Sequence, residues 1–182
     1  QFASGELKKD RNIVKTAIKE NGLALRYASL ELQNDREIVL AAVTKNVNAL
    51  QYAYDLRNDR NIVLAAVNLN GLALKFVNPT FLDDKNIIMA AVKENGLALE
   101  FASEEMKKDQ EIVLAAVDED GFALQFAYKE LQDDYGIVIK AVEQDGLALE
   151  FASDTLKEDS EIVLAAVRNN GGALEFAPEE LQ

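Results

Sequence analysis

The chain has 182 residues, of which 49% are hydrophobic and 28% charged, and its formal net charge is −13. These values are typical of a folded, water-soluble protein, and its apolar runs are far shorter than the roughly 20 residues of a membrane-spanning helix. Cys and His are absent, which excludes disulfides, Cys nucleophiles, His general bases and the usual zinc, haem and iron–sulfur ligand sets.

The charge is divided unevenly along the chain. Residues 1–91 carry 12 Lys and Arg against 10 Asp and Glu, whereas residues 92–182 carry 7 against 22. Phosphate backbones are repelled by such an excess of acid, so we expect no nucleic acid partner. The acidic half predicts attraction of a basic protein or peptide, although a surface kept soluble by its charge explains the same imbalance.

One motif recurs along the whole chain, and each copy opens with an aspartate. The interval is 25 residues, except between Asp35 and Asp59, where it is 24. A fixed period of this length is typical of a solenoid, in which each unit buries its apolar face against its neighbours. We therefore predict one elongated array over 1–182, with 1–9 as a partial unit. Seven units are expected to start at Asp10, Asp35, Asp59, Asp84, Asp109, Asp134 and Asp159.

Each unit begins with a pattern that predicts an α-helix of about 10 to 11 residues. In the fifth unit, Asp109 is expected to cap the start of this helix with its side chain. Gly121 is expected to end it in a left-handed conformation. The apolar residues cover one face of the helical wheel, which we expect to be buried between units: Ile112, Val113, Ala116 and Val117.

A second, shorter helix of about two turns is predicted after the glycine, over residues 97–102 of the fourth unit. The segment that follows, 103–108, predicts a turn of 3₁₀ or short α-helix anchored by Met106. Phe101 belongs to a ladder of aromatic residues with one member per unit, beginning at Phe2. Such a ladder could stack on nucleobases, but the absence of a basic groove favours core packing.

The second unit departs from this pattern. Val47 stands where the other units have glycine, and one residue is missing between Tyr52 and Leu56. A β-branched residue at positive φ is very costly. We therefore expect a local bend or change of register between residues 46 and 58, although the unit could also adapt without consequence.

The sixth unit concentrates several unusual residues. It carries Tyr135-Gly136 after its aspartate, and Lys140 where most units have alanine. Chance variation within a repeat is the favoured explanation of these differences, but they also mark the candidate for a contact patch. The predicted partner-binding residues are Glu111, Asp118, Tyr128, Tyr135, Lys140 and Glu143.

Adjacent carboxylates such as Asp83 and Asp84 recur at expected turns and helix caps. Acid–base catalysis instead requires two carboxylates in a shared, partly buried pocket. No phosphate-binding glycine loop or nucleophile elbow occurs either. We therefore expect no enzyme, no cofactor and no metal site.

The motifs Asp-x-Glu-Ile-Val-Leu-Ala-Ala-Val, Asn-Gly-Leu-Ala-Leu, Phe-Ala-Ser and Glu-Leu-Lys together resemble the tandem family known as domain of unknown function 4116. The resemblance spans nearly the whole chain, and it implies no activity or site because the family carries none. Residues 1–4 match residues 100–103 within a unit, so we expect the sequence to be a piece of a longer chain.

The predicted fold is therefore an all-α, right-handed α-solenoid of seven two-helix units. The leading hypothesis is a soluble, monomeric, intracellular scaffold for protein–protein interaction, with no membrane partner. The alternative is a passive spacer that positions other domains of the parent protein. Recognition is expected at the third, seventh, tenth and eleventh residues of each unit, over a floor of small residues: Ala41, Ala65, Ala90, Ala115 and Ala165.

Overall fold

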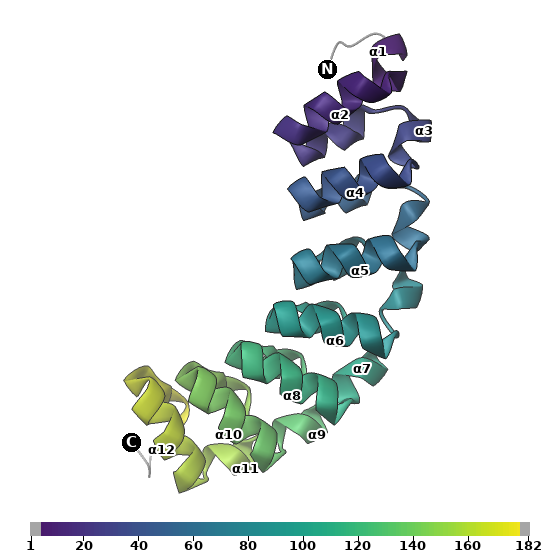
Figure 1. The fold of residues 1–182 in the computed structure, drawn as a ribbon. Helices are drawn as coiled ribbons and strands as arrows, with labels where there is room; N and C mark the ends of the chain where they lie inside the picture. Colours follow the sequence, from purple (N-terminus) through teal and green to yellow (C-terminus); the bar gives the residue numbers. More distant parts are fainter. Residues whose placement is uncertain (1–4, 179–182) are drawn as a thin grey trace.

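The computed structural model describes residues 5–178 and is helical throughout that range, with no strand. Ten-residue α-helices lie side by side in a curved stack (Figure 1). They are α2 (Arg11–Glu20), α4 (Arg36–Lys45), α5 (Arg60–Leu69), α6 (Lys85–Glu94), α8 (Gln110–Glu119), α10 (Tyr135–Gln144) and α12 (Ser160–Asn169).

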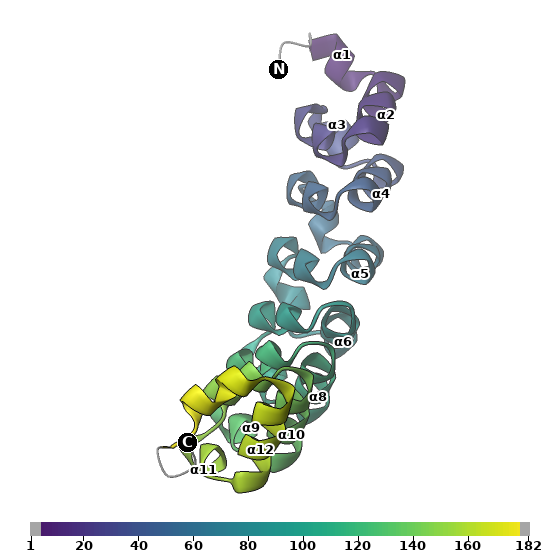
Figure 2. The same cartoon turned by 90° about the vertical axis from the view of Figure 1, so that its left-hand side faces the viewer.

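A six-residue 3₁₀ helix follows each of these α-helices and forms a second layer beside them (Figure 2). The predicted second helix is thus present, although its hydrogen bonding is 3₁₀ rather than α. The 3₁₀ helices are η1 (Gly22–Tyr27), η2 (Val47–Tyr52), η4 (Gly71–Phe76), η6 (Gly96–Phe101), η7 (Gly121–Phe126), η8 (Gly146–Phe151) and η9 (Gly171–Phe176).

Short helical segments connect the layers along the convex edge of the stack (Figure 1). They confirm the predicted third segment of each unit. They are α1 (Gly5–Lys9), α3 (Leu30–Gln33), η3 (Leu56–Asn58), η5 (Pro79–Phe81), α7 (Glu104–Lys108), α9 (Lys129–Gln132) and α11 (Asp154–Lys157).

The predicted aspartate caps are confirmed. Asp109 Oδ1 accepts hydrogen bonds from the backbone N–H groups of Glu111 and Ile112, at 3.0 and 3.3 Å. These bonds satisfy donors that a helix start otherwise leaves without a partner. The equivalent aspartates also cap their own helices, with two such bonds at Asp10, Asp59, Asp84 and Asp159 and one at Asp35 and Asp134.

The prediction of left-handed glycine caps is wrong. Among the described residues none has a positive φ, glycines included. The residue before the glycine instead caps the start of the 3₁₀ helix. Asn95 has an extended backbone with φ −158°, and its side chain accepts a hydrogen bond from the backbone N–H of Leu97 at 3.0 Å. Glycine is needed here for space, because a Cβ on Gly96 would overlap the carbonyl oxygen of Ala116 in the next α-helix. The same close approach occurs at Gly22, Gly71, Gly121 and Gly146.

The core runs between the two layers through the whole stack. The apolar face predicted for α8, made of Ile112, Val113, Ala116 and Val117, is fully buried, and the 3₁₀ helices contribute residues such as Leu99. From Tyr52 to Phe176 the aromatic ladder packs against this core but is only half-buried, and Tyr27 is 40% exposed, which corrects the prediction of core residues. In a 3₁₀ helix Phe101 points about 120° away from Leu99, so both cannot face inward. Phe2 lies outside the described residues.

Backbone hydrogen bonds and ion pairs tie successive units together. Ser103 N donates to Leu82 O at 2.8 Å, and equivalent bonds tie most of the other neighbouring units. In the first half of the chain, the residue after a capping aspartate pairs with the next capping aspartate, as Arg36 Nη2 does with Asp59 Oδ1 at 2.8 Å. Further pairs of this kind are Arg11–Asp35, Arg60–Asp84 and Lys85–Asp109. Gln110, Tyr135 and Ser160 replace these cations in the second half of the chain, which contributes to its acidity.

The contact between the units of α4 and α5 departs from the others. Asn46 keeps the usual extended backbone and caps η2 through Asn48 N at 3.0 Å. Val47 does not have a positive φ, so the steric cost expected there does not arise. The backbone changes further on, at Ala53, whose ψ is 75° where the equivalent Ala102 has 157°. The backbone N–H of Asp55 then donates a hydrogen bond to the side chain of Asn34, at 3.0 Å from its Oδ1. At the equivalent place in other units, the backbone N–H donates to a backbone carbonyl oxygen. A local rearrangement therefore lies within the predicted range 46–58.

No helix within residues 5–178 combines the length and the apolar character needed to cross a membrane.

Candidate interaction surface

The ten-residue helices expose one side, here called the outer face. On α8 it consists of Glu111, Leu114, Ala115, Asp118 and Glu119, and the other ten-residue helices present the equivalent positions. The opposite side of each helix is occupied by the core and cannot reach a partner. The outer face includes the positions at which the sequence predicted recognition.

A stripe of apolar side chains crosses the outer face, and it was not predicted from the sequence. Leu40, Leu114 and Leu164 are 41%, 39% and 49% exposed, at the sixth place of their units. On a helical wheel this place borders both faces, so the wheel alone does not show whether the side chain reaches solvent. Exposed apolar side chains in a regular row are typical of binding surfaces. The half-buried members of the row are Leu64, Met89 and Ile139.

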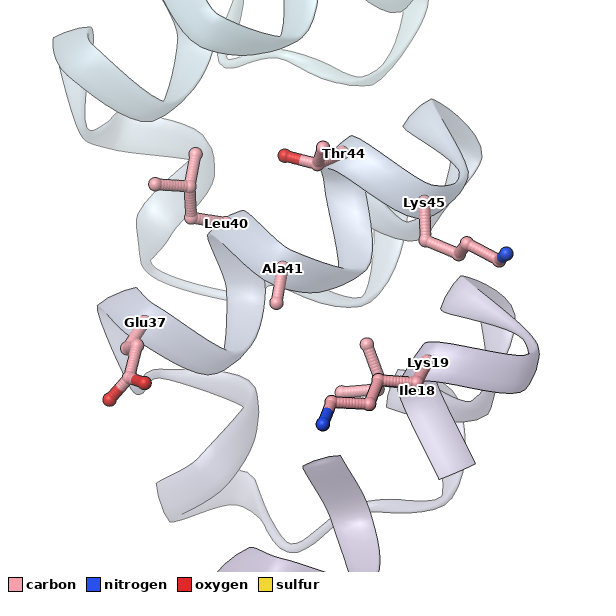
Figure 3. A pocket seen from close by; sticks show the side chains of 7 residues that line it. All are labelled: Ile18, Lys19, Glu37, Leu40, Ala41, Thr44 and Lys45. Atoms are coloured by element: carbon pink, nitrogen blue, oxygen red, sulfur yellow. The ribbon is translucent and has the colours of Figure 1, made fainter. Parts of the chain in front are cut away.

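Grooves open on this face between neighbouring helices. The groove between α2 and α4 has a volume of about 560 Å³ and is lined by side chains from both helices (Figure 3). A second groove of about 370 Å³ lies over α6, α8 and α10. Ala41 lines the first groove and Ala115 the second. Both belong to the alanine floor that the sequence analysis described.

Several predicted site residues meet at the second groove. Lys140 Nζ lies 2.8 Å from Asp118 Oδ1, and this hydrogen bond raises the pKa of Lys140. Glu111 lines the same groove and pairs with Lys85, whose Nζ lies 2.8 Å from its Oε2. Their charges are thus partly balanced within the array while the carboxylates stay exposed to solvent.

Tyr135 and Glu143 belong to the neighbouring helix α10, and both are exposed. The Tyr135 hydroxyl donates a hydrogen bond to Glu161 on α12, and this bond to a carboxylate raises the pKa of Tyr135. Tyr135 is therefore tied to the next unit rather than to Lys140.

Tyr128 lies apart from the other predicted site residues. It caps the start of α9 at the convex edge, where Lys108 Nζ lies 4.8 Å from the centroid of its ring. A third cavity of about 360 Å³ is lined there by Lys108, Tyr128, Glu130 and Leu131. The structure thus places five of the six predicted residues on the ten-residue helices α8 and α10, and Tyr128 elsewhere.

The described part of the chain, residues 5–178, contains no group of three or more acidic side chains arranged to hold a metal ion. The grooves are open and shallow, and their carboxylates are solvent-exposed or paired with lysine. This arrangement offers surfaces for contact along the stack.

The recurring caps, core positions and close glycine contacts define a tandem-repeat, all-α protein. The chain belongs to the family described as Domain of unknown function (DUF4116), which confirms the resemblance seen in the sequence. Its model matches residues 1–33, 10–55, 35–82, 84–132 and 134–182, and four of these matches start at an aspartate that opens a unit. Comparisons with curated proteins and with solved structures gave no match.

Proposed function

We propose that the chain is a non-catalytic scaffold that binds protein partners along the outer face of its ten-residue helices. Its fold in this proposal is a right-handed superhelix of seven units. Experimental coordinates with a left-handed superhelix would overturn that part of the proposal without affecting the binding surface.

The observation that carries the proposal is the row of exposed leucines beside the grooves. Leu114 is 39% exposed and lies directly beside Ala115 and Asp118 in the second groove. Solvent-exposed leucine contributes little to folding, whereas its burial by a partner removes apolar surface from water. A partner side chain seated over Ala115 would bury Leu114 and meet the carboxylates around it.

The charge of the surface around this groove favours a basic partner. Asp118 and Glu143 are exposed on adjacent helices, and residues 92–182 carry 22 acidic against 7 basic side chains. The negative charge of this surface attracts a basic partner and repels acidic partners.

A basic probe peptide of repeated Lys-Lys-Leu triplets, labelled with fluorescein, tests this proposal by fluorescence anisotropy. We expect saturable binding that weakens with added salt. The double variant Asp118→Lys and Glu143→Lys should bind at least tenfold more weakly. A matched control reverses Glu100 and Glu150, which are exposed on the 3₁₀ layer, and should keep the affinity within about twofold.

The alternative function, a passive spacer, gives the opposite outcome. A spacer shows no saturable binding to the probe, or loses affinity equally in both double variants because only total charge matters. Either result would overturn the proposed scaffold role of the acidic half.

A further inference from the structure

The groove between α2 and α4 differs in chemistry from the acidic half of the outer face. Two helices line it, and the side chains of Ala41 and Ile18 face each other across it (Figure 3). The lining residues are Ile18, Lys19, Glu37, Leu40, Ala41 and Thr44, with Lys45 at the end of α4.

The floor of this groove is apolar and accessible. Ala41 is exposed, and Leu40 beside it is 41% exposed. Because alanine projects only a methyl group, it leaves room above it for an aliphatic side chain from outside. Ile18 on α2 lies below the surface of the groove, where it is fully buried and belongs to the core.

The charge available in the groove is positive. Glu37 is its one lining carboxylate, and it is already paired with Arg11 and Lys15 on the neighbouring helix. Lys19 and Lys45, by contrast, have no ion-pair partner among the described residues, and both are exposed. The groove therefore offers two ammonium groups whose charge is not balanced within the array.

Corresponding places in the acidic half are closed by side chains. Gln144 Nε2 donates to Asp118 O, and Asn169 Nδ2 donates to Glu143 O at 2.8 Å, so each amide bridges two neighbouring helices. Lys45 occupies the place equivalent to Gln144 and Asn169, and its counterpart on α2 is Lys19. The groove between α2 and α4 therefore has a lysine at each of the two positions that these bridges join, and both lysines line it.

We propose that the groove between α2 and α4 binds an acidic peptide segment. One aliphatic side chain of the peptide lies on Ala41 beside Leu40, and the peptide's carboxylates pair with Lys19 and Lys45. A bare anion or a nucleic acid backbone would gain nothing from the apolar floor, because neither brings an aliphatic side chain to Ala41 and Leu40. This inference rests on the proposed scaffold role, but it concerns a different pair of helices and a partner of opposite charge.

A fluorescein-labelled peptide of repeated Glu-Glu-Leu triplets provides the probe, and fluorescence anisotropy measures its binding. We expect saturable binding that weakens in 0.5 M salt. A Glu-only peptide of equal length should bind at least fivefold more weakly, because it leaves the apolar floor empty.

Two sets of variants locate the site. The double variant Lys19→Glu and Lys45→Glu should weaken binding at least tenfold, whereas Lys93→Glu with Lys129→Glu, which changes the net charge equally, should leave it within about twofold. Ala41→Trp should fill the groove and reduce affinity at least fivefold while the circular dichroism spectrum stays that of the parent protein.

The outcomes separate this inference from the proposed function. Absence of saturable binding to the acidic probe, or equal losses in the two lysine double variants, would overturn the inference while leaving binding of the basic probe at Asp118 and Glu143 untouched. Loss of basic-probe binding alone would overturn only the proposal for the acidic half.

Discussion

The carbonyl oxygen of Ala116 lies in the space that a Cβ on Gly96 would occupy. The two residues are 20 positions apart and belong to consecutive units, so this contact sets how closely one unit approaches the next. Similar contacts recur along the stack wherever glycine opens a 3₁₀ helix against a following α-helix. Glycine thus acts here through its lack of a side chain, and its access to positive φ is not used.

Replacing Gly96 with alanine should therefore destabilise the protein. We expect a loss of about 1–3 kcal/mol, the usual cost of forcing an extra methyl group into a packed interior. Gly171 provides the matched control, because nothing described lies within 4 Å of its added Cβ. Gly171→Ala should leave stability unchanged or raise it by about 0.4–1 kcal/mol. Urea denaturation measures both, and equal effects would contradict the role of close contact.

The smaller residue Leu99 should contribute more to the stability of the fold than the larger residue Phe101. Leu99 is fully buried, whereas Phe101 is half-buried at the edge of the core. Leu99→Ala should cost about 2–5 kcal/mol through lost burial and a cavity. Phe101→Ala should cost about 1–2 kcal/mol, since only part of its surface is removed from water. A larger loss for Phe101→Ala in the same denaturation experiment would show that the aromatic ladder dominates the core.

The paired carboxylates near α2 predict a specific response to acid. Hydrogen bonds from Arg11 hold the pKa of Asp35 below its ordinary value, and those from Lys15 and Arg11 do the same for Glu37. Because folding lowers these pKa values, the pairs stabilise the fold above the unfolded-state values near about 4. This contribution is lost as the pH falls through the lower folded-state values.

Thermal unfolding of Arg11→Met across this pH range measures the contribution of the pairs. The variant should be less stable than the parent protein at pH 7, and the difference should shrink as the pH falls below about 4. Lys45→Met removes a lysine without an ion pair, so its effect should not vary in this way. A constant difference for Arg11→Met would show that the pairs do not contribute.

The rearranged contact between α4 and α5 should open more readily than its neighbours. Asp55 N is held by the Asn34 side chain, whereas Ser103 N is held by the backbone carbonyl of Leu82. Amide hydrogen exchange should be faster at Asp55 than at Ser103, since local opening has a lower free energy where fewer contacts hold the segment. Asn34→Ala should speed exchange at Asp55 further and leave Ser103 unchanged. Equal protection at both amides would contradict a weak point here.

Local features of the units followed from the sequence because they depend on neighbours along the chain. The caps at Asp10 and Asp109 and the buried apolar face of α8 were all readable from residue type and helical period. The short segment anchored by Met106 was predicted for the same reason. Each of these features is fixed within about one turn of helix.

Features that depend on contact between units were not readable in this way. An Asn-Gly pair is compatible both with a left-handed helix cap and with close packing of another backbone against the glycine. At Gly96 only the position of the Ala116 carbonyl oxygen in the next unit shows that close packing is the reason for glycine. The exposure of Leu114 likewise depends on the absence of a third layer over the outer face.

By itself, the sequence determined that the chain is a helical tandem repeat, because its caps and apolar period repeat every 25 residues with one exception. Only the tertiary structure decided which side chains are left for a partner. The groove at Ala41 exists because α2 and α4 lie side by side. Its two lysines, which have no ion-pair partner among the described residues, come from helices whose lining residues are 18 or more positions apart in the chain. They share one groove only once the units have stacked.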